Sequence, residues 1–391
     1  MNDDLIHLLE KKIATNELDS FLQSELGQQS PIIENNPADE NNLIVTFIYQ
    51  GDGDCHNANL YSSLVGNLPQ PMIRLKNTNY FYYQVIVPNN IRASYAFLPN
   101  WIIHEVDRTD REKSLKLFAE LWPELINDPY NPDKQILTTG EAKATINMSI
   151  LEMPAAPSKI WSDQNKQTPQ GSVTRHTITS KSLNSDRDYW VYLPKAYDKN
   201  TQYPLLLVFD GQLYYESGIP LPTILDNLIA ENKISPVIAV LIDSVGFITR
   251  RTDLNCSETY LEFITDELLS EIHSRYLIST NRADRIVMGA SLGGIFSLYA
   301  ALKRSDLFGK VLSNSSGSNA IIDRLIQMNH SSKLKVYLDI GSLENPDSTK
   351  AVRDLLLAND HAVIYQEFPG AHDYACWETS IPSALMQLLN D

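Results

Sequence analysis

The chain has 391 residues, of which 43% are hydrophobic and 20% charged, and this length favours two globular domains over one core. The formal net charge of −16 argues against nucleic acid or an anionic membrane surface as a partner. The three cysteines (Cys55, Cys256 and Cys376) match no metal motif and no disulfide framework. Because the N-terminus is acidic and no long apolar run is present, we expect a cytoplasmic protein without a signal peptide.

The first 42 residues are predicted to form a helix and a linker. Apolar residues recur at helical spacing over 4–26, and a polar stretch with two prolines follows over 27–42. From residue 43 the apolar period changes to two. Short strands with turn residues between them predict a small all-β sandwich domain over 43–157, and the segments concerned are 43–49, 60–65, 72–75, 80–87 and 93–98.

Two features close this first domain. Residues 108–126 have the pattern of a helix, which must end before the two prolines of Asp128-Pro129-Tyr130-Asn131-Pro132. A Pro-rich stretch, Met153-Pro154-Ala155-Ala156-Pro157, then marks the boundary of the next domain.

Strands and helices alternate over 158–391. The expected strands are 171–181, 187–193, 204–209, 237–242, 285–288, 311–313, 334–340 and 362–368. The expected helices are 221–232, 258–276, 295–302, 348–359 and 378–390. This alternation predicts a doubly wound, mostly parallel sheet of the α/β-hydrolase kind, preceded by the smaller sandwich domain.

The segment Gly289-Ala290-Ser291-Leu292-Gly293 follows an apolar strand and precedes a helix. Small residues on both sides of the serine allow the strand and helix backbones to approach closely in a sharp turn. Such a turn exposes the Ser291 hydroxyl, and it leaves the amide of Leu292 at a helix N-terminus to stabilise an oxyanion. The pattern indicates a serine hydrolase with Ser291 as nucleophile.

A serine nucleophile needs a base and usually an acid, which follow it in this fold in the order serine, acid, histidine. His372 lies in the turn after the last strand and is the predicted base. Glu344 lies in the loop after the preceding strand and is the predicted acid, with Asp347 and Asp339 as alternatives. A further alternative is that no acid is required, because a backbone carbonyl or a water can orient the imidazole.

The second oxyanion donor is expected after an early strand, where Asp210-Gly211-Gln212 stands, so the amide of Gly211 or Gln212 is the candidate. Asp210 either contributes to substrate binding or braces the turn. Arg250 and Arg251 follow another strand at the same edge. They are candidates for binding anionic or phenolic oxygens, the alternative being ion pairs with neighbouring acids such as Asp253 or Glu258.

With these pieces in order, residues 43–391 resemble the enterochelin esterases. The tracts that carry the resemblance are Asp128–Pro132, Leu151–Pro157, Asp210-Gly211, Arg251–Leu254, Asn281–Arg285, Gly289–Gly294 and His372–Trp377. The resemblance implies that Ser291 is the nucleophile, that His372 is the base, and that the sandwich helps to cover the site and bind substrate. Within the last tract we expect Trp377 to contact the substrate.

The chain departs from that family at a few positions. Asn319 and Ala320 stand where family members have an aromatic pair suited to stacking on a catechol ring, and Glu378 stands where a basic residue would suit a catecholate. The expected activity is hydrolysis of ester or lactone bonds of a catecholate siderophore to release iron in the cytoplasm. We expect no metal or organic cofactor, with iron arriving only as part of the substrate.

Two alternatives stay open. One is a general carboxylesterase or acyltransferase that acts on another hydroxy-acid, peptide or polyketide ester. The other is a binding protein that retains the fold without catalysis.

Overall fold

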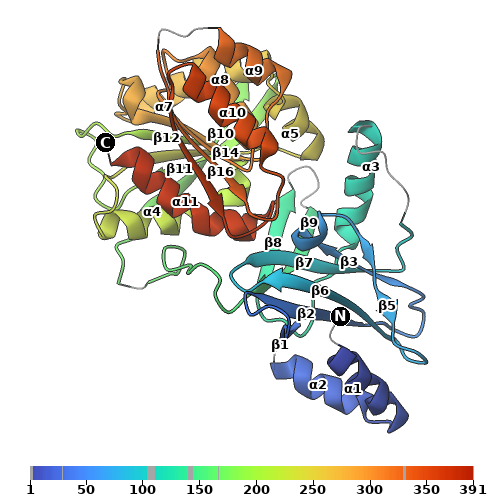
Figure 1. Cartoon of the computed structure of the whole chain (residues 1–391). Helices are drawn as coiled ribbons and strands as arrows, with labels where there is room; N and C mark the ends of the chain where they lie inside the picture. Colours follow the sequence, from blue (N-terminus) through green and yellow to red (C-terminus); the bar gives the residue numbers. More distant parts are fainter. Residues whose placement is uncertain are drawn as a thin grey trace. The chain divides into compact units, whose positions relative to one another are not determined.

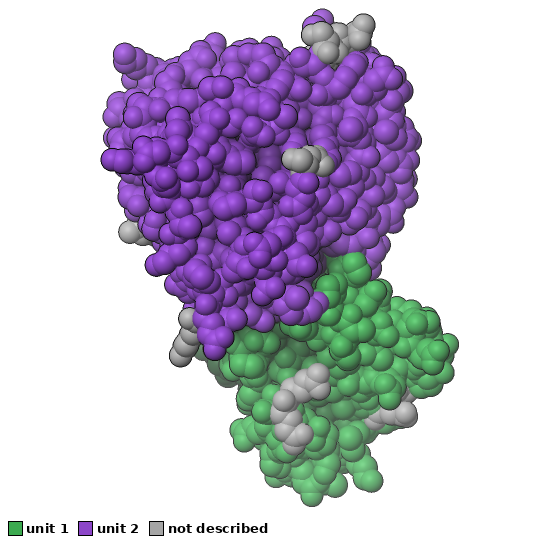
Figure 2. Space-filling model, turned by 90° about the vertical axis from the view of Figure 1, so that its left-hand side faces the viewer, with its two compact units in different colours: residues 1–137, 145–157, 369–375 green, residues 138–144, 158–368, 376–391 purple. Residues whose placement is uncertain are grey.

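The computed structural model describes residues 3–28, 30–103, 111–139, 144–165, 167–328 and 332–390. The chain divides into two compact units, coloured separately in Figure 2. Unit 1 comprises Met1–Leu137, Thr145–Pro157 and Pro369–Ala375. Unit 2 comprises Thr138–Ala144, Ser158–Phe368 and Cys376–Asp391. A short segment from the C-terminal part of the chain is therefore counted with unit 1.

Unit 1 contains two antiparallel sheets, with strand orders β1-β2-β6-β5 and β4-β3-β7-β9-β8 (Figure 1). The strands are β1 Ile32–Asn35, β2 Asn42–Gln50, β3 Ala58–Ser62, β4 Gln70–Pro71, β5 Ile73–Arg74, β6 Tyr80–Pro88, β7 Arg92–Pro99, β8 Lys134–Thr139 and β9 Ala144–Glu152. Apolar side chains from both sheets form one core, in which the rings of Phe47 and Tyr95 lie 4.7 Å apart. The predicted all-β domain is confirmed. Helix α3 (Arg111–Leu121) follows β7, and the start predicted for it at residue 108 lies outside the described residues.

The N-terminal residues differ from the predicted helix and linker. Two helices, α1 (Asp3–Ala14) and α2 (Leu18–Gln28), replace the single helix, because Asn16 adopts a φ of 58° that no helix continues. Part of the expected linker is β1, an edge strand whose Ile32 pairs with Thr46 of β2. Its four residues were too few, among polar neighbours, to show a strand pattern. The apolar faces of α1 and α2 pack against Ile48, Leu75 and Tyr80 of the sandwich.

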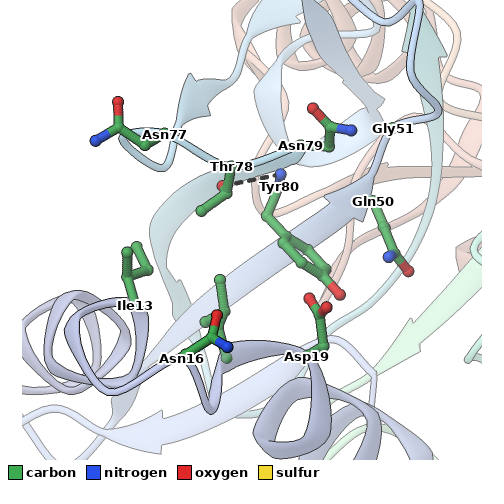
Figure 3. Close-up of a pocket in the computed structure, with 10 residues that line it drawn as sticks. Ile13, Asn16, Asp19, Gln50, Gly51, Asn77, Thr78, Asn79 and Tyr80 are labelled. Atoms are coloured by element: carbon green, nitrogen blue, oxygen red, sulfur yellow. Dashed lines mark hydrogen bonds between the residues drawn. The ribbon is translucent and has the colours of Figure 1, made fainter.

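A polar pocket of about 390 Å³ lies where the turn between α1 and α2 meets the ends of β2 and β6 (Figure 3). Its lining residues are Ile13, Asn16, Leu18, Asp19, Gln50, Gly51 and Asn77–Tyr80. The Tyr80 ring extends toward Asp19 (Figure 3). Burial is the main cause that raises the pKa of the Tyr80 hydroxyl, and the Asp19 carboxylate adds to it. The N-terminal helices thus form part of the surface of unit 1.

Unit 2 is built on a sheet of eight strands in the order β10-β11-β13-β12-β14-β15-β16-β17. The strands are β10 Ser172–Ser180, β11 Ser185–Leu193, β12 Leu205–Phe209, β13 Ile238–Ile242, β14 Arg285–Ala290, β15 Lys310–Asn314, β16 Lys335–Gly341 and β17 Ala362–Phe368. Strand β11 pairs antiparallel with β10 on one side and with β13 on the other. The remaining neighbours in the sheet, from β13 through β12 and β14 to β17, pair in parallel. The predicted mostly parallel sheet is confirmed.

Helices cover both faces of this sheet (Figure 1). They are α4 Leu221–Ala230, α5 Phe247–Leu254, α6 Glu258–Glu262, α7 Leu269–Arg275, α8 Leu292–Lys303, α9 Ala320–Gln327, α10 Asp347–Ala358 and α11 Tyr374–Leu389. One face packs on α6 to α10 through a core that includes Leu207 and Val240. On the other face, Tyr192 of β11 donates to Asp226 of α4, and Lys310 of β15 donates to the Leu388 carbonyl of α11. Within the described residues, no helix is both long and apolar enough to cross a membrane.

Arginines hold together the N-terminal edge of the parallel strands. Arg282, in the turn before β14, donates to the Lys333 carbonyl at 2.9 Å. Arg285 donates to the Ser279 carbonyl at 2.7 Å and is buried. The Asn281–Arg285 tract therefore has a structural role at the edge opposite the strand ends that carry Ser291 and Glu344.

The Asp128–Pro132 tract organises the interior of unit 1. The fully buried Asp128 carboxylate accepts hydrogen bonds from the Ser30 hydroxyl at 2.6 Å, the Tyr95 hydroxyl at 2.8 Å and the Tyr130 amide at 2.9 Å. Asn131 donates to the Tyr95 hydroxyl and to the Ile150 carbonyl. A carboxylate buried with three donors ties the loop to β7 and to the chain before β1.

Replacing Asp128 by alanine should lower the free energy of unfolding by about 3 kcal/mol, because buried hydroxyl donors lose a charged acceptor. Chemical denaturation measures the change. Asp133→Ala is the matched control, since Asp133 lies in the same loop with an exposed side chain, and it should change stability by less than about 0.5 kcal/mol. Equal stabilities of the two variants would contradict the assigned role of Asp128.

Candidate active site

Ser291 occupies a sharp turn between β14 and α8. Its backbone has φ 56° and ψ −120°, a combination that non-glycine residues rarely adopt and that stores strain. A Cβ on Gly289 would lie 2.5 Å from the carbonyl carbon of Gly293, so the close approach of strand and helix requires glycine there. The Ser291 amide donates to the Asn314 carbonyl of β15 at 2.8 Å. The strand, turn and helix expected from the sequence are present, with Ser291 at the carboxyl end of the sheet.

The candidate oxyanion loop lies beside this turn. Strand β12 is the parallel neighbour of β14, with Val208 opposite Met288, so Gly211 and Gln212 follow at the same edge of the sheet as Ser291. A Cβ on Gly211 would lie 2.4 Å from the Ile242 amide nitrogen, which leaves no space for a side chain.

The candidate oxyanion donors are backbone amides in two segments, the loop at Gln212 and the start of α8 at Leu292. The Gln212 side chain donates to the Ser244 hydroxyl at 2.6 Å and accepts from the Ser244 amide at 3.2 Å, which fixes the loop. Leu292 is the first residue of α8, and the first amides of a helix have no acceptor within it. The two segments can therefore direct backbone amides at an oxygen near Ser291.

Asp210 and Arg250, both predicted to bind substrate, pair with each other. The Arg250 Nε and Nη2 atoms donate to the two carboxylate oxygens of Asp210 at 2.7 and 2.8 Å. The Asp210 side chain is 1% exposed and that of Arg250 is 18% exposed. Asp210 Oδ2 lies 3.1 Å from where a Cβ on Gly293 would be, which brings this ion pair to the serine turn. Asp210 therefore braces the turn, and the guanidinium reaches the surface in part.

The other acids considered for the arginine pair have their own partners. Asp253 pairs with Arg187 at 3.0 Å, and both side chains are buried. Burial raises the pKa of Asp253 to about 6, while Arg187 acts in the opposite direction. Glu258 pairs with Lys303 at 2.9 Å. Arg251 lies on α5 directly after Arg250 and is half-buried.

Glu344 lies at the end of β16 in a set of hydrogen bonds. Its Oε1 atom accepts from the Ser315 hydroxyl at 2.6 Å and from the Gly341 amide at 2.9 Å. The Trp377 indole donates to the same Ser315 hydroxyl at 2.9 Å, and the Trp377 side chain is 2% exposed. Trp377 therefore supports Glu344 through Ser315. Ser315 was missed as a functional candidate, although it directly follows a parallel strand at the edge that carries Ser291.

The alternative acids are placed differently. Asp339 lies within β16, is fully buried, and accepts from the Asn314 side chain at 2.8 Å. Burial raises the pKa of Asp339 to about 7, although hydrogen bonds from Ser380 and Asn314 act in the opposite direction. Asp347 is exposed at the first position of α10.

His372 belongs to the segment Pro369–Ala375, which is counted with unit 1. The segment directly follows Phe368, the last residue of β17 and the register partner of Gly341 in β16. The His372 carbonyl accepts from the Asn67 side chain at 3.3 Å. The structure thus gathers Ser291, Gly211 and Glu344 at one edge of unit 2 and holds the backbone of His372 through unit 1.

Asn319 and Ala320, two positions at which the sequence departs from the expected family pattern, lie at the start of α9, where Asn319 is the N-cap and Ala320 the first residue. The Asn319 side chain accepts from the amides of Ile321 and Ile322 at 3.0 and 2.9 Å and so caps the helix. Its amide also lies 3.6 Å from the Cys256 sulfur. This position is used for helix capping.

Comparison with known proteins gives matches over both units. Residues 180–388 match the family model described as putative esterase, and residues 44–162 match the model described as enterochelin esterase, N-terminal. The iron(III) enterobactin esterase of Escherichia coli (strain K12) is 28% identical over 338 residues, covering 82% of this chain and 82% of that protein.

Two solved structures extend the match to the whole fold. The enterobactin esterase of Shigella flexneri, solved in the presence of 2,3-di-hydroxy-N-benzoyl-serine, is 25% identical with a TM-score of 0.74, covering 95% of this chain and 98% of that one. The same enzyme in the presence of enterobactin is 24% identical with a TM-score of 0.75, covering 93% and 97%.

The raised pKa of Asp339 makes its effect on stability depend on pH. The native state keeps the proton up to about pH 7, whereas the unfolded chain loses it near the ordinary value of 3.8. The stability associated with this carboxyl is therefore complete below about pH 4 and is lost as the pH rises toward 7. Asp339→Asn removes this dependence. When the pH is raised from 5 to 8, the native protein should lose about 2 kcal/mol of unfolding free energy that the variant keeps.

Chemical denaturation at the two pH values measures this loss. Asp347→Asn, which removes a carboxylate from an exposed position, is the matched variant. A difference between Asp339→Asn and the native protein that does not change with pH would show that Asp339 titrates normally.

Proposed function

Because the chain belongs to the putative esterase family and carries the N-terminal domain of enterochelin esterases before its esterase domain, we propose that it hydrolyses ester bonds of a catecholate siderophore of the enterobactin kind. The observation that carries the proposal is the joint presence of the N-terminal domain over 44–162 and the Ser291 turn in the esterase domain. The iron(III) enterobactin esterases match this chain over most of its length. Hydrolysis would release the iron carried by the siderophore, and the cytoplasmic location expected from the sequence stays a prediction.

In the proposed reaction the Ser291 hydroxyl attacks the ester carbonyl, and the His372 imidazole takes its proton. The imidazole then donates that proton to the leaving alcohol as the bond between the carbonyl carbon and the alcohol oxygen breaks. Water, deprotonated by the same imidazole, attacks the acyl-enzyme and frees Ser291. The strained turn at Ser291 supports this role because it holds the hydroxyl at the end of the sheet.

Charge develops on the carbonyl oxygen during both attacks. We assign its stabilisation to the amide of Leu292 at the start of α8 and to the amide of Gly211 or Gln212 after β12. Three features support this assignment: the adjacency of β12 and β14, the lack of space for a side chain at Gly211, and the hydrogen bonds that fix Gln212. Preorganised amides of this kind contribute about 3 kcal/mol each to transition-state stabilisation.

Glu344 is the acid that we propose orients His372. Its carboxylate lies in the loop at the carboxyl end of β16, three residues after the register partner of Phe368. The Ser315 hydroxyl and the Gly341 amide hold it there. Asp339 is buried within the strand and bonded to Asn314, and Asp347 is exposed on a helix, so neither is supported in the same way.

Arg250 and Arg251 are the proposed contacts for anionic or phenolic oxygens of the substrate. The Arg250 guanidinium is fixed by Asp210 next to the serine turn and is partly exposed, which supports recognition of a fixed oxygen. Because Asn319 caps α9 and cannot stack, a catechol ring has to be held without the aromatic pair of the family at this position.

The substrate assignment is tested by hydrolysis of ferric and iron-free enterobactin, compared with a p-nitrophenyl ester of a short acid. We expect release of dihydroxybenzoyl-serine species at a rate well above cleavage of the simple ester. Ser291→Ala and His372→Ala should each lower kcat by about 10⁴-fold or more. Rapid cleavage of the simple ester with no release from enterobactin would reject the siderophore and favour a general carboxylesterase.

The identity of the acid is tested with isosteric amides. Glu344→Gln should lower kcat by at least about 100-fold, because the imidazolium loses its carboxylate. Asp339→Asn and Asp347→Asn should stay within about threefold of the native rate. Full activity of Glu344→Gln, with loss in one of the other two variants, would transfer the role to that aspartate.

A further inference from the structure

The segment that carries His372 is attached to the β-sandwich by a buried carboxylate. Asp373 Oδ2 accepts hydrogen bonds from the Ser63 hydroxyl at 2.8 Å, the Ser94 amide at 2.5 Å and the Ser94 hydroxyl at 2.6 Å. The Asp373 side chain is buried. All three donors belong to unit 1, and they are 279 and 310 positions away along the chain.

The second oxygen of the same carboxylate has a separate task. Asp373 Oδ1 accepts from the Ala375 amide at 2.9 Å, which caps the first turn of α11. Asp373 therefore connects its own backbone to the sandwich through one oxygen and to the start of α11 through the other. His372 directly precedes it, and the His372 carbonyl is held by Asn67 of the sandwich.

The sandwich side of this contact is itself well fixed. Ser63 begins a short 3-10 turn (Ser63–Val65), which is capped by the Ser62 hydroxyl at one end and by Gly66, with φ 86°, at the other. Ser94 lies in β7 and pairs with Ile150 of β9. The Ser62 hydroxyl also donates to the Ser94 carbonyl at 2.8 Å, which joins the residue before Ser63 to Ser94. The donors are therefore preorganised for the carboxylate.

We propose that Ser63 and Ser94 of the β-sandwich are positioning residues for His372, acting through Asp373. This inference rests on the proposed function of His372 as the general base. It assigns to the sandwich a task separate from any contact with the substrate.

The expected effect follows from the geometry of proton transfer. A general base must lie within hydrogen-bond reach of the serine hydroxyl, and a displacement of about 1 Å lowers the rate by about 100-fold. Asp373, the residue directly after His372, is held by three donors to one carboxylate oxygen, and two of these donors are hydroxyls. Removing the hydroxyls loosens the segment while leaving the imidazole and the substrate contacts chemically unchanged.

The test uses Ser63→Ala, Ser94→Ala and the double variant in the full chain. The readouts are steady-state cleavage of p-nitrophenyl acetate and the rate of Ser291 labelling by a fluorophosphonate, neither of which depends on the siderophore. We expect kcat and the labelling rate to fall by about tenfold in each single variant and about 100-fold in the double variant, with KM within about twofold.

Two controls separate positioning from general loosening. Ser149→Ala removes another buried hydroxyl of the same sandwich, one that accepts from the Asp128 amide, and should keep the native kcat at a comparable loss of thermal stability. In the His372→Ala background, the Ser63→Ala/Ser94→Ala pair should cause no further loss of residual labelling, since its effect acts through the imidazole.

The outcomes are distinct. A double variant with native kcat and labelling rate, while His372→Ala is inactive, overturns this inference and leaves the proposed function intact. A further loss in the His372→Ala background overturns the inference as well, because the serines then act through something other than His372. Native activity in His372→Ala rejects His372 as the base and the inference with it.

Discussion

The close approach of α8 to β14 is the constraint on which the rest of unit 2 depends. Gly289 and Gly293 allow the two backbones to touch, and the contact holds Ser291 in a backbone conformation that an L-residue rarely adopts. Once that turn is fixed, the amide of Leu292, the loop after β12 and the Asp210–Arg250 pair occupy the same edge of the sheet. The strain at one serine is offset by the packed sheet around it.

Buried aspartates organise the turns of both units. Asp210 is bonded to a guanidinium, Asp128 to two hydroxyls and an amide, and Asp373 to two hydroxyls and two amides. A buried carboxylate is costly unless its oxygens find donors, so each of these residues specifies the geometry of the chain that surrounds it. Asp339 is fully buried within β16, and this burial raises the pKa of its carboxyl to about 7.

Sequence patterns predicted the fold because the apolar residues follow clear periods. They alternate with polar residues in the strands of the sandwich, and in unit 2 they form continuous apolar strands followed by segments of helical spacing. The Gly-x-Ser-x-Gly pattern likewise predicted the sharp turn at Ser291, since that turn is a local structure. The break at Asn16 and the edge strand β1 were not predicted, because one residue and four residues give no period. The contacts of Asp373 with Ser63 and Ser94, and of Ser315 with Glu344, join distant positions that no local pattern relates.

The return of residues 369–375 to unit 1 has a consequence for how such proteins can diversify. Recombination at residue 157 would join a sandwich from one lineage to a hydrolase sheet from another, yet Asp373, the partner of Ser63 and Ser94, follows the last strand of that sheet in the sequence. Exchange of the sandwich alone would separate Ser63 and Ser94 from the Asp373 carboxylate that accepts their hydrogen bonds. An exchange of the sandwich that keeps this carboxylate with its donors therefore has to carry residues 369–375 as well.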